Sequence, residues 1–95
     1  MSAYELVLVF APTIAKDKLE GVIGQVHKQV EKAEGKFGAV EQWGKRPLAY
    51  PIGKNAEGVY SLLQFTVPAS AVSGLEKEIR LQELVLRHLL VKREE

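Results

Sequence analysis

Two prolines, Pro47 and Pro51, interrupt a segment that otherwise has the composition of a β-strand. Proline has no backbone N–H, so within a sheet it is confined to an edge strand, to the first residue of a strand or to a bulge. Residues four apart lie on the same side of the hydrogen-bonding ladder, so both prolines can face away from the neighbouring strand while the residues between them bond inward. Residues 43–52 are therefore predicted to form an edge strand or a bulged one.

This segment also carries two adjacent cations, Lys45 and Arg46. Charged side chains on an edge strand protect it from pairing with the wrong chain. The same side chains are suited to contact RNA or a chosen protein partner, because Arg and Lys bind phosphate and carboxylate oxygens. Both interpretations stay open from the residues alone.

The composition is that of one small globular domain spanning residues 1–95, with 46% hydrophobic and 26% charged residues. No apolar run approaches the roughly 20 residues that span a bilayer, and no secretory signal is recognisable at the start, so we expect a soluble cytoplasmic protein. The absence of cysteine excludes disulfides and thiolate chemistry. The net charge of +1 is low for an RNA-binding protein, so any RNA contact must come from clustered cations.

The hydrophobic pattern predicts four strands and two helices. Strands are expected at residues 4–10, 37–52, 59–67 and 84–92, with a possible break near Gly44 and a hairpin loop at residues 53–58. One helix has apolar residues at helical spacing from Leu19 to Ala33 and is expected to terminate at Gly35. A second helix follows Pro68 and ends between residues 80 and 83.

This order of elements predicts an α+β protein with the ferredoxin-like split β-α-β-β-α-β fold, a four-stranded antiparallel sheet with two helices on one face. Strands 4–10 and 59–67 would be central, which leaves the proline-containing strand at an edge. The other face of the sheet stays uncovered and is half apolar, so we expect it to pack on a partner protein or on a second copy of the chain. Its predicted residues are Glu5, Val7, Val9, Tyr60, Leu62 and Gln64.

No pattern of catalytic or metal-ligating residues is recognisable. His27 and His88 have no acidic residue beside them at metal-ligand spacing, and Gly53-Lys54 is not part of a complete phosphate-binding loop. We therefore expect no enzyme activity, no cofactor, no metal and no small-molecule substrate.

The candidate RNA-binding residues are the cations that the predicted fold places on the edge strand, in the hairpin and near the chain end, together with one histidine beside them. They are Lys45, Arg46, Lys54, Arg80, Arg87, His88, Lys92 and Arg93. A few such side chains position a protein on folded RNA through phosphate contacts without reading bases. For Arg80 and Arg87, an internal salt bridge to Glu83 or Glu5 is an equally good interpretation.

The candidate partner-protein interface consists of Trp43 and Tyr50 on the edge strand and Tyr60 and Leu62 on the open sheet face. Large aromatic side chains are enriched at interfaces, although either of the first two is equally suited to burial under the helices. The aliphatic side chains around Tyr60 favour contact with protein over stacking with bases.

Residues 43–52, Trp-Gly-Lys-Arg-Pro-Leu-Ala-Tyr-Pro-Ile, resemble the core motif of the bacterial small-subunit ribosomal protein number six family. Other features occur in the family's order: Tyr4-Glu5 in the first strand, the hairpin, and Arg80 and Arg87 on either side of the entry to the last strand. The resemblance therefore covers nearly the whole chain. It implies a non-catalytic constituent of the small ribosomal subunit in the cytoplasm. Its partners would be small-subunit ribosomal RNA of the central domain and small-subunit ribosomal protein eighteen, bound cooperatively.

The chain departs from that family at three places: Ser2 and Ala3 replace the usual basic residues, Pro47 is uncommon, and the chain stops at Glu95 without the usual extension. The resemblance therefore does not carry the family's contacts through basic tails over to this chain. The alternative hypothesis is a ferredoxin-like regulatory module that oligomerises through its open sheet face and binds a small ligand between subunits. Such a module would remain assembled when pure, whereas a ribosomal protein without its partner would be monomeric.

Overall fold

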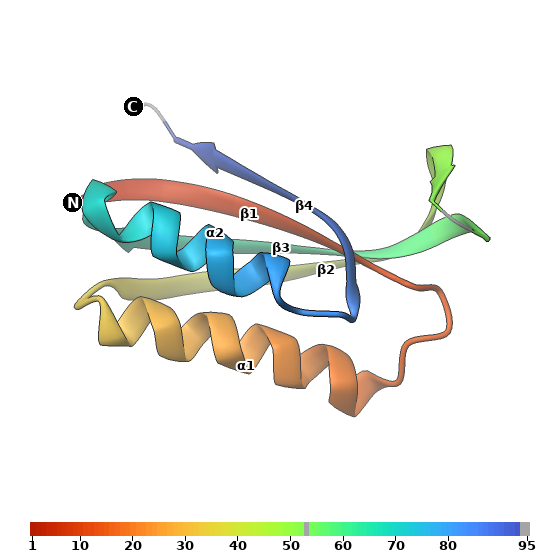
Figure 1. The fold of residues 1–95 in the computed structure, drawn as a ribbon, viewed down its shortest axis with the longest axis horizontal. Helices are drawn as coiled ribbons and strands as arrows, with labels where there is room; N and C mark the ends of the chain where they lie inside the picture. Colours follow the sequence, from red (N-terminus) through yellow and green to blue (C-terminus); the bar gives the residue numbers. More distant parts are fainter. Residues whose placement is uncertain (53, 94–95) are drawn as a thin grey trace.

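The computed structural model describes residues 1–52 and 54–93, which form four strands, two α-helices and a short 3-10 turn at Ala69–Ala71. The elements in chain order are β1 (Ser2–Phe10), α1 (Lys16–Lys32), β2 (Lys36–Ile52), β3 (Asn55–Val67), α2 (Val72–Arg80) and β4 (Val85–Lys92). All strand pairs are antiparallel, and both helices lie on one face of the sheet (Figure 1). The predicted ferredoxin-like split β-α-β-β-α-β fold is confirmed.

The strand order is β2-β3-β1-β4, so β1 and β3 are central and the proline-containing β2 is an edge strand, as predicted. One part of the proline argument is wrong. The pairing of β2 with β3 is regular at Pro47, opposite Glu57, and resumes only at Ile52, opposite Asn55. The residues between the two prolines are therefore not paired in regular register with β3. Two residues without a backbone N–H so close together in one strand favour a bulge over a regular edge strand.

The core lies between the sheet and the helices. On β1, Leu6, Leu8 and Phe10 are fully buried on the helix-facing side, and Leu63 and Val67 on β3 lie beside them. The buried stripe of α1 closes this core, consisting of Leu19, Val22, Val26 and Val30. Its spacing of three and four residues keeps these side chains on one side of the helix, so burial alone orients α1 on the sheet.

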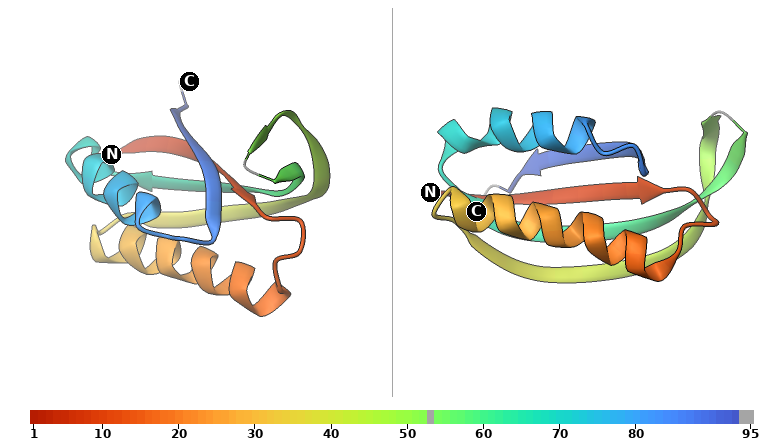
Figure 2. Two further views of the ribbon diagram at one scale, coloured as in Figure 1. Left: turned by 45° about the vertical axis from the view of Figure 1, so that its right-hand side comes forward. Right: turned by 60° about the horizontal axis from the view of Figure 1, so that its bottom comes forward.

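The hairpin between β2 and β3 is shorter than predicted. Of the predicted loop 53–58, residue 53 lies outside the described residues, and Asn55 to Gly58 already belong to β3. Gly58 is buried, and a Cβ at this position would lie 2.6 Å from a methyl group of Val9. The polar Asn-Ala-Glu-Gly sequence resembles a loop, but the missing side chain of this glycine is what lets β3 pass close to β1. The left view in Figure 2 shows the end of the hairpin curling away from the sheet.

Helix α1 ends in a Schellman motif, one residue earlier than predicted. The Gly35 N–H donates to the Val30 carbonyl and the Glu34 N–H to the Glu31 carbonyl, both at 2.9 Å. The left-handed residue of this motif is Glu34, with φ of 63°, and not Gly35. Gly35 is required for a different reason, because a Cβ there would lie 2.2 Å from the Thr66 carbonyl oxygen.

Replacing Glu34 with Gly is therefore expected to stabilise the protein by about 1 kcal/mol, since glycine adopts the left-handed conformation without the steric cost of a side chain. The free energy of unfolding, measured by urea denaturation, checks this value. Gly35→Ala is the matched comparison and should destabilise by roughly 1–3 kcal/mol through overpacking against β3. Equal effects of the two substitutions would contradict the assignment of the left-handed position.

Candidate nucleic-acid and protein interface

A bulge in β2 brings the side chains of Trp43 and Arg46 together on one surface near the hairpin. Gln42 lies opposite Ser61 and Gly44 lies opposite Tyr60, so Trp43 is an extra residue on the β2 side. Gly44 has φ of 77°, a conformation that glycine adopts readily at bulges. Residues three apart face opposite sides of a regular strand. The extra residue brings Trp43 and Arg46 to the same side, the open face of the sheet.

On this face Arg46, Trp43 and Tyr60 form a stack, called the Arg46 stack below. The Arg46 guanidinium carbon lies 5.7 Å from the centroid of the Trp43 ring. The Trp43 and Tyr60 rings are 6.4 Å apart with an interplanar angle of 17°. A cation–π contact of this kind is worth about 0.5–1 kcal/mol at an exposed site. The stack therefore holds an exposed arginine in a defined position before any ligand arrives.

The other candidate residues near the hairpin are also exposed, but they do not all lie on the open face of the sheet. Lys45 lies opposite Val59, on the side of the sheet that faces the helices, so the two adjacent cations of the motif point to different surfaces. Lys54 is exposed at the hairpin, and Tyr50 is 78% exposed in the segment where β2 leaves the regular ladder. Of the two aromatic side chains predicted as interface anchors, neither is buried under the helices.

The apolar surface of the open face differs from the prediction. Leu62 is only 6% exposed and so offers almost no contact area, although it lies on the open face opposite Val7. The exposed apolar side chains there are Leu89, 58% exposed, and Val91, 46% exposed, on β4. Sequence reasoning missed both. The side chains of residues 87–91 alternate between the two faces of the sheet. Which of them point to the open face could be known only from the register in which β4 pairs with β1.

The candidates near the last turn lie on two different faces. Arg87 lies opposite Val9 and is exposed on the open face, whereas His88 lies opposite Leu8 and faces the helices. The His88 Nε2 is 3.7 Å from the Glu76 carboxylate, which Arg80 also contacts at 3.3 Å. Arg80 therefore makes an internal salt bridge, one of its two interpretations, but its partner is Glu76 one helical turn earlier and not Glu83.

The last two candidates lie beside the start of β1. Lys92 is exposed opposite Tyr4. The main chain of Arg93 donates a hydrogen bond to the Ala3 carbonyl at 2.8 Å, and its side-chain Nε is 3.9 Å from the Glu5 carboxylate. Glu5 thus pairs with Arg93 and not with Arg87. The structure distributes the predicted cations over both ends of the sheet instead of gathering them into one patch.

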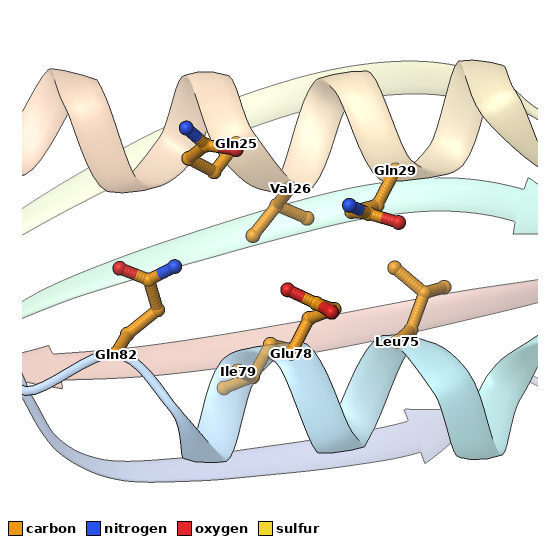
Figure 3. Close-up of a pocket in the computed structure, with 7 residues that line it drawn as sticks. All are labelled: Gln25, Val26, Gln29, Leu75, Glu78, Ile79 and Gln82. Atoms are coloured by element: carbon orange, nitrogen blue, oxygen red, sulfur yellow. The ribbon is translucent and has the colours of Figure 1, made fainter.

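A small cleft separates the two helices (Figure 3). Its side chains come from α1 and from α2 with the turn after it, and they are Gln25, Val26, Gln29, Leu75, Glu78, Ile79 and Gln82. Its volume is about 10 Å³, which is the space of about one water molecule. His27 does have an acidic residue at metal-ligand spacing, because its Nε2 lies 3.6 Å from the Glu31 carboxylate four residues later, so that part of the prediction is wrong. Among the residues that the structure describes, no cluster of three or more potential metal ligands is present. Within the same residues, neither helix has the length and hydropathy of a membrane-crossing segment.

The fold and its surfaces define a class of protein: a ferredoxin-like split βαβ protein that presents cations and exposed apolar side chains on its sheet. The sequence profile of the family described as Ribosomal protein S6 matches residues 3–92. This chain belongs to the ribosomal protein S6 family.

Individual relatives agree with this assignment. Small ribosomal subunit protein bS6 of Brucella canis is 41% identical over 95 residues, which is 100% of this chain and 64% of that protein. The corresponding protein of Brucella melitensis biotype 1 is 40% identical over the same lengths. The chain thus spans 64% of the length of these curated relatives.

Solved structures agree as well. The crystal structure of 30S ribosomal protein S6 from Thermotoga maritima superposes with a TM-score of 0.87 and 29% identity, covering 97% of this chain and 87% of that one. The C-terminal domain of the MgtC protein from Mycobacterium tuberculosis has a TM-score of 0.66 at 10% identity over 99% of this chain and 89% of that one, a likeness that shows the fold alone.

The family is a structural, non-enzymatic component of the small ribosomal subunit, which lies in the cytoplasm of bacteria. Because the chain belongs to this family, the predictions of the family, of a non-enzymatic protein and of a cytoplasmic location are confirmed for the family as a whole. Family membership also favours a ribosomal protein over the alternative of a ligand-binding regulatory module.

Proposed function

We propose that this chain is a structural constituent of the small ribosomal subunit that binds ribosomal RNA of the central domain together with small-subunit ribosomal protein eighteen. The observation that carries the proposal is the Arg46 stack, which fixes an exposed guanidinium at the end of the sheet. A guanidinium held in place loses less conformational entropy when it binds a phosphate, and its planar fork donates hydrogen bonds to two phosphate oxygens at once.

The exposed side chains of the open sheet face support the proposal of a protein partner. It combines the exposed Leu89 and Val91 of β4 with Trp43 of β2, which is 40% exposed. Apolar and aromatic side chains exposed on one face are typical of protein–protein interfaces. Because Arg46 belongs to the same face, a partner seated there would lie beside the arginine that binds RNA.

This arrangement explains how a chain with a net charge of only +1 functions in an RNA assembly. Two proteins that bind each other first present the cations of both as one surface. The second contact with RNA is then made at a high effective concentration, so the pair binds much more tightly than either protein alone.

The test is binding to a central-domain RNA fragment, with and without small-subunit ribosomal protein eighteen, across a series of salt concentrations. We expect tight binding only with the partner, and affinity that falls as salt rises. Arg46→Glu should weaken binding by roughly tenfold and lower the salt slope by about 1, as expected for a lost phosphate contact.

Lys77→Glu is the matched control, because Lys77 is exposed on α2, on the opposite side of the sheet from the Arg46 stack. It carries the same charge change and should leave binding nearly unchanged. Two results would overturn the proposal: no binding of the unaltered chain under either condition, or equal losses for the two variants.

A further inference from the structure

A groove of about 380 Å³ lies at the end of the sheet opposite the hairpin, where β1 begins and β4 ends (Figure 1). It is distinct from the Arg46 stack and from the open-face side chains assigned to the partner protein. Its lining residues are Ala3, Tyr4, Lys36, Phe37, Gly38, Gln64, Phe65, Thr66 and Arg93. Of these, only Arg93 belongs to the cations that the sequence predicted to bind RNA.

The hollow results from a bulge and from small side chains. Phe37 lies opposite Phe65, but the next paired residue of β2 is Val40, opposite Leu63, so β2 has one extra residue at Gly38. A Cβ at Gly38 would lie 3.0 Å from the Gln64 carbonyl oxygen, so a glycine is needed for the close approach of these strands.

Two cations flank this groove across the whole width of the sheet. Lys36 lies opposite Thr66, Thr66 lies opposite Ala3, and the Arg93 N–H bonds to the Ala3 carbonyl at 2.8 Å. These four residues form one row over all strands. With strands about 4.8 Å apart, the main chains at the two ends of the row are roughly 14 Å apart, a span that two long side chains can bridge from both sides.

Glu5 controls the charge at the rim of the groove. Its carboxylate lies 3.9 Å from the Arg93 Nε and accepts a hydrogen bond from the Gln64 amide at 3.4 Å. Both of these donors line the groove. Glu5 therefore holds them in place when the groove is empty, and its negative charge opposes the binding of an anion.

We propose that this groove binds one nucleotide of single-stranded RNA, with its phosphate contacted by Lys36 and Arg93. The volume is within the range of small-ligand sites. Tyr4 and Phe65 are buried on the helix side of the sheet, so the open-face lining consists of the small Ala3 and Gly38 with Thr66 and Gln64. The small residues leave room for a ribose, and the Thr66 hydroxyl and Gln64 amide supply hydrogen-bonding groups for a base edge or a 2′-hydroxyl. The inference rests on the proposed function, and it adds a second RNA contact at the other end of the sheet.

An acidic peptide fits these features less well. Its carboxylates would pair with the two cations, but the side chains between them offer no further positive charge, and the hollow would remain unfilled. A nucleotide uses the cations and the hollow together. For this reason the groove is assigned to RNA, and a peptide is treated as a competing outcome of the test.

The experiment is an NMR titration of the intact chain with pentauridylate RNA at low salt. We expect chemical-shift changes concentrated at the amides of Gly38, Gln64, Thr66 and Arg93. Arg93→Gln should weaken the affinity by about tenfold, because an ionic hydrogen bond is lost. Glu5→Gln should tighten it by roughly threefold, because a repulsive surface charge is removed while the hydrogen bond from Gln64 is kept. A role of Glu5 in stability alone would not raise RNA affinity.

Lys28→Gln, an exposed position on α1 away from the groove, is the control for the general loss of one positive charge. The inference is overturned if Arg93→Gln weakens binding no more than Lys28→Gln, if the shifts lie elsewhere, or if pentaglutamate produces the same shifts as strongly. The spectra of the variants without RNA show that each is folded.

This result is separable from the proposed function. If the unaltered chain and its partner bind the central-domain RNA fragment but Arg93→Gln changes nothing in either assay, the groove is wrong and the proposed function stands. If pentauridylate binds in the groove while the fragment does not bind with or without the partner, the groove stands and the proposed function fails.

Discussion

Replacing Leu8 with Ala should reduce the free energy of unfolding by about 2–5 kcal/mol, the range for a leucine truncated in a well-packed core. Leu8 is fully buried in the middle of the central strand β1. It lies between Ser61 of β3 and His88 of β4, so three strands surround the cavity that the substitution would leave. Typical domains are stable by only 5–15 kcal/mol, so this single change removes a large share of the total. Urea denaturation followed by circular dichroism measures the effect.

The control is Leu89→Ala, which deletes the same atoms from the neighbouring strand. Leu89 lies opposite Val7 and is 58% exposed on the open face. We expect a change within about 0.5 kcal/mol, as is usual for surface substitutions. If the two leucines cost the same, the assignment of the helix-facing and open sides of the sheet would be wrong. Should Leu8→Ala fail to fold, Leu8→Val provides a smaller truncation with the same expected direction.

Replacing Trp43 with Ala should lower the affinity for small-subunit ribosomal protein eighteen by about 30-fold or more, the loss typical of a central aromatic anchor in an interface. Trp43 is 40% exposed and contacts both Tyr60 and Arg46 within the stack. Its removal deletes contact area and also releases the arginine. Isothermal titration calorimetry with the purified partner measures the loss.

Stability separates this effect from misfolding. Because Trp43 is partly exposed, the free energy of unfolding should fall by only about 1 kcal/mol, the value of one aromatic contact. Leu81→Ala is the matched control, since Leu81 is 66% exposed directly after α2, away from the open face. A similar loss of affinity for Leu81→Ala, or none for Trp43→Ala, would show that the partner binds elsewhere.

Local patterns were sufficient for the order and type of the elements. The apolar residues of α1 recur at helical spacing, and burial of that stripe orients the helix, so the period of the sequence predicted the packing. Likewise, the missing backbone donors of Pro47 and Pro51 restrict β2 to an edge or a bulge in any sheet, and the structure has both. Both features are local physical constraints, which is why the sequence alone revealed them.

The candidate site was less predictable, because a one-residue change in register reverses the direction of every following side chain. The sequence indicated a possible break near Gly44, but not that an extra residue at Trp43 places Arg46 and Trp43 on one face and Lys45 on the other. The same limitation applies to His88. It is adjacent to Arg87 in sequence, but its side chain lies on the helix-facing side of the sheet, near Glu76 of α2.

By itself, the sequence determined the split β-α-β-β-α-β order, the edge position of the proline-containing strand and the resemblance to the family, since these depend on periodicity, on missing donors and on a contiguous motif. Only the tertiary structure decided which cations share a surface, which apolar side chains of the open face are exposed, and that Lys36 and Arg93 flank one groove. Those properties depend on the register of strands far apart in the chain, and register is set by the packing of the whole sheet.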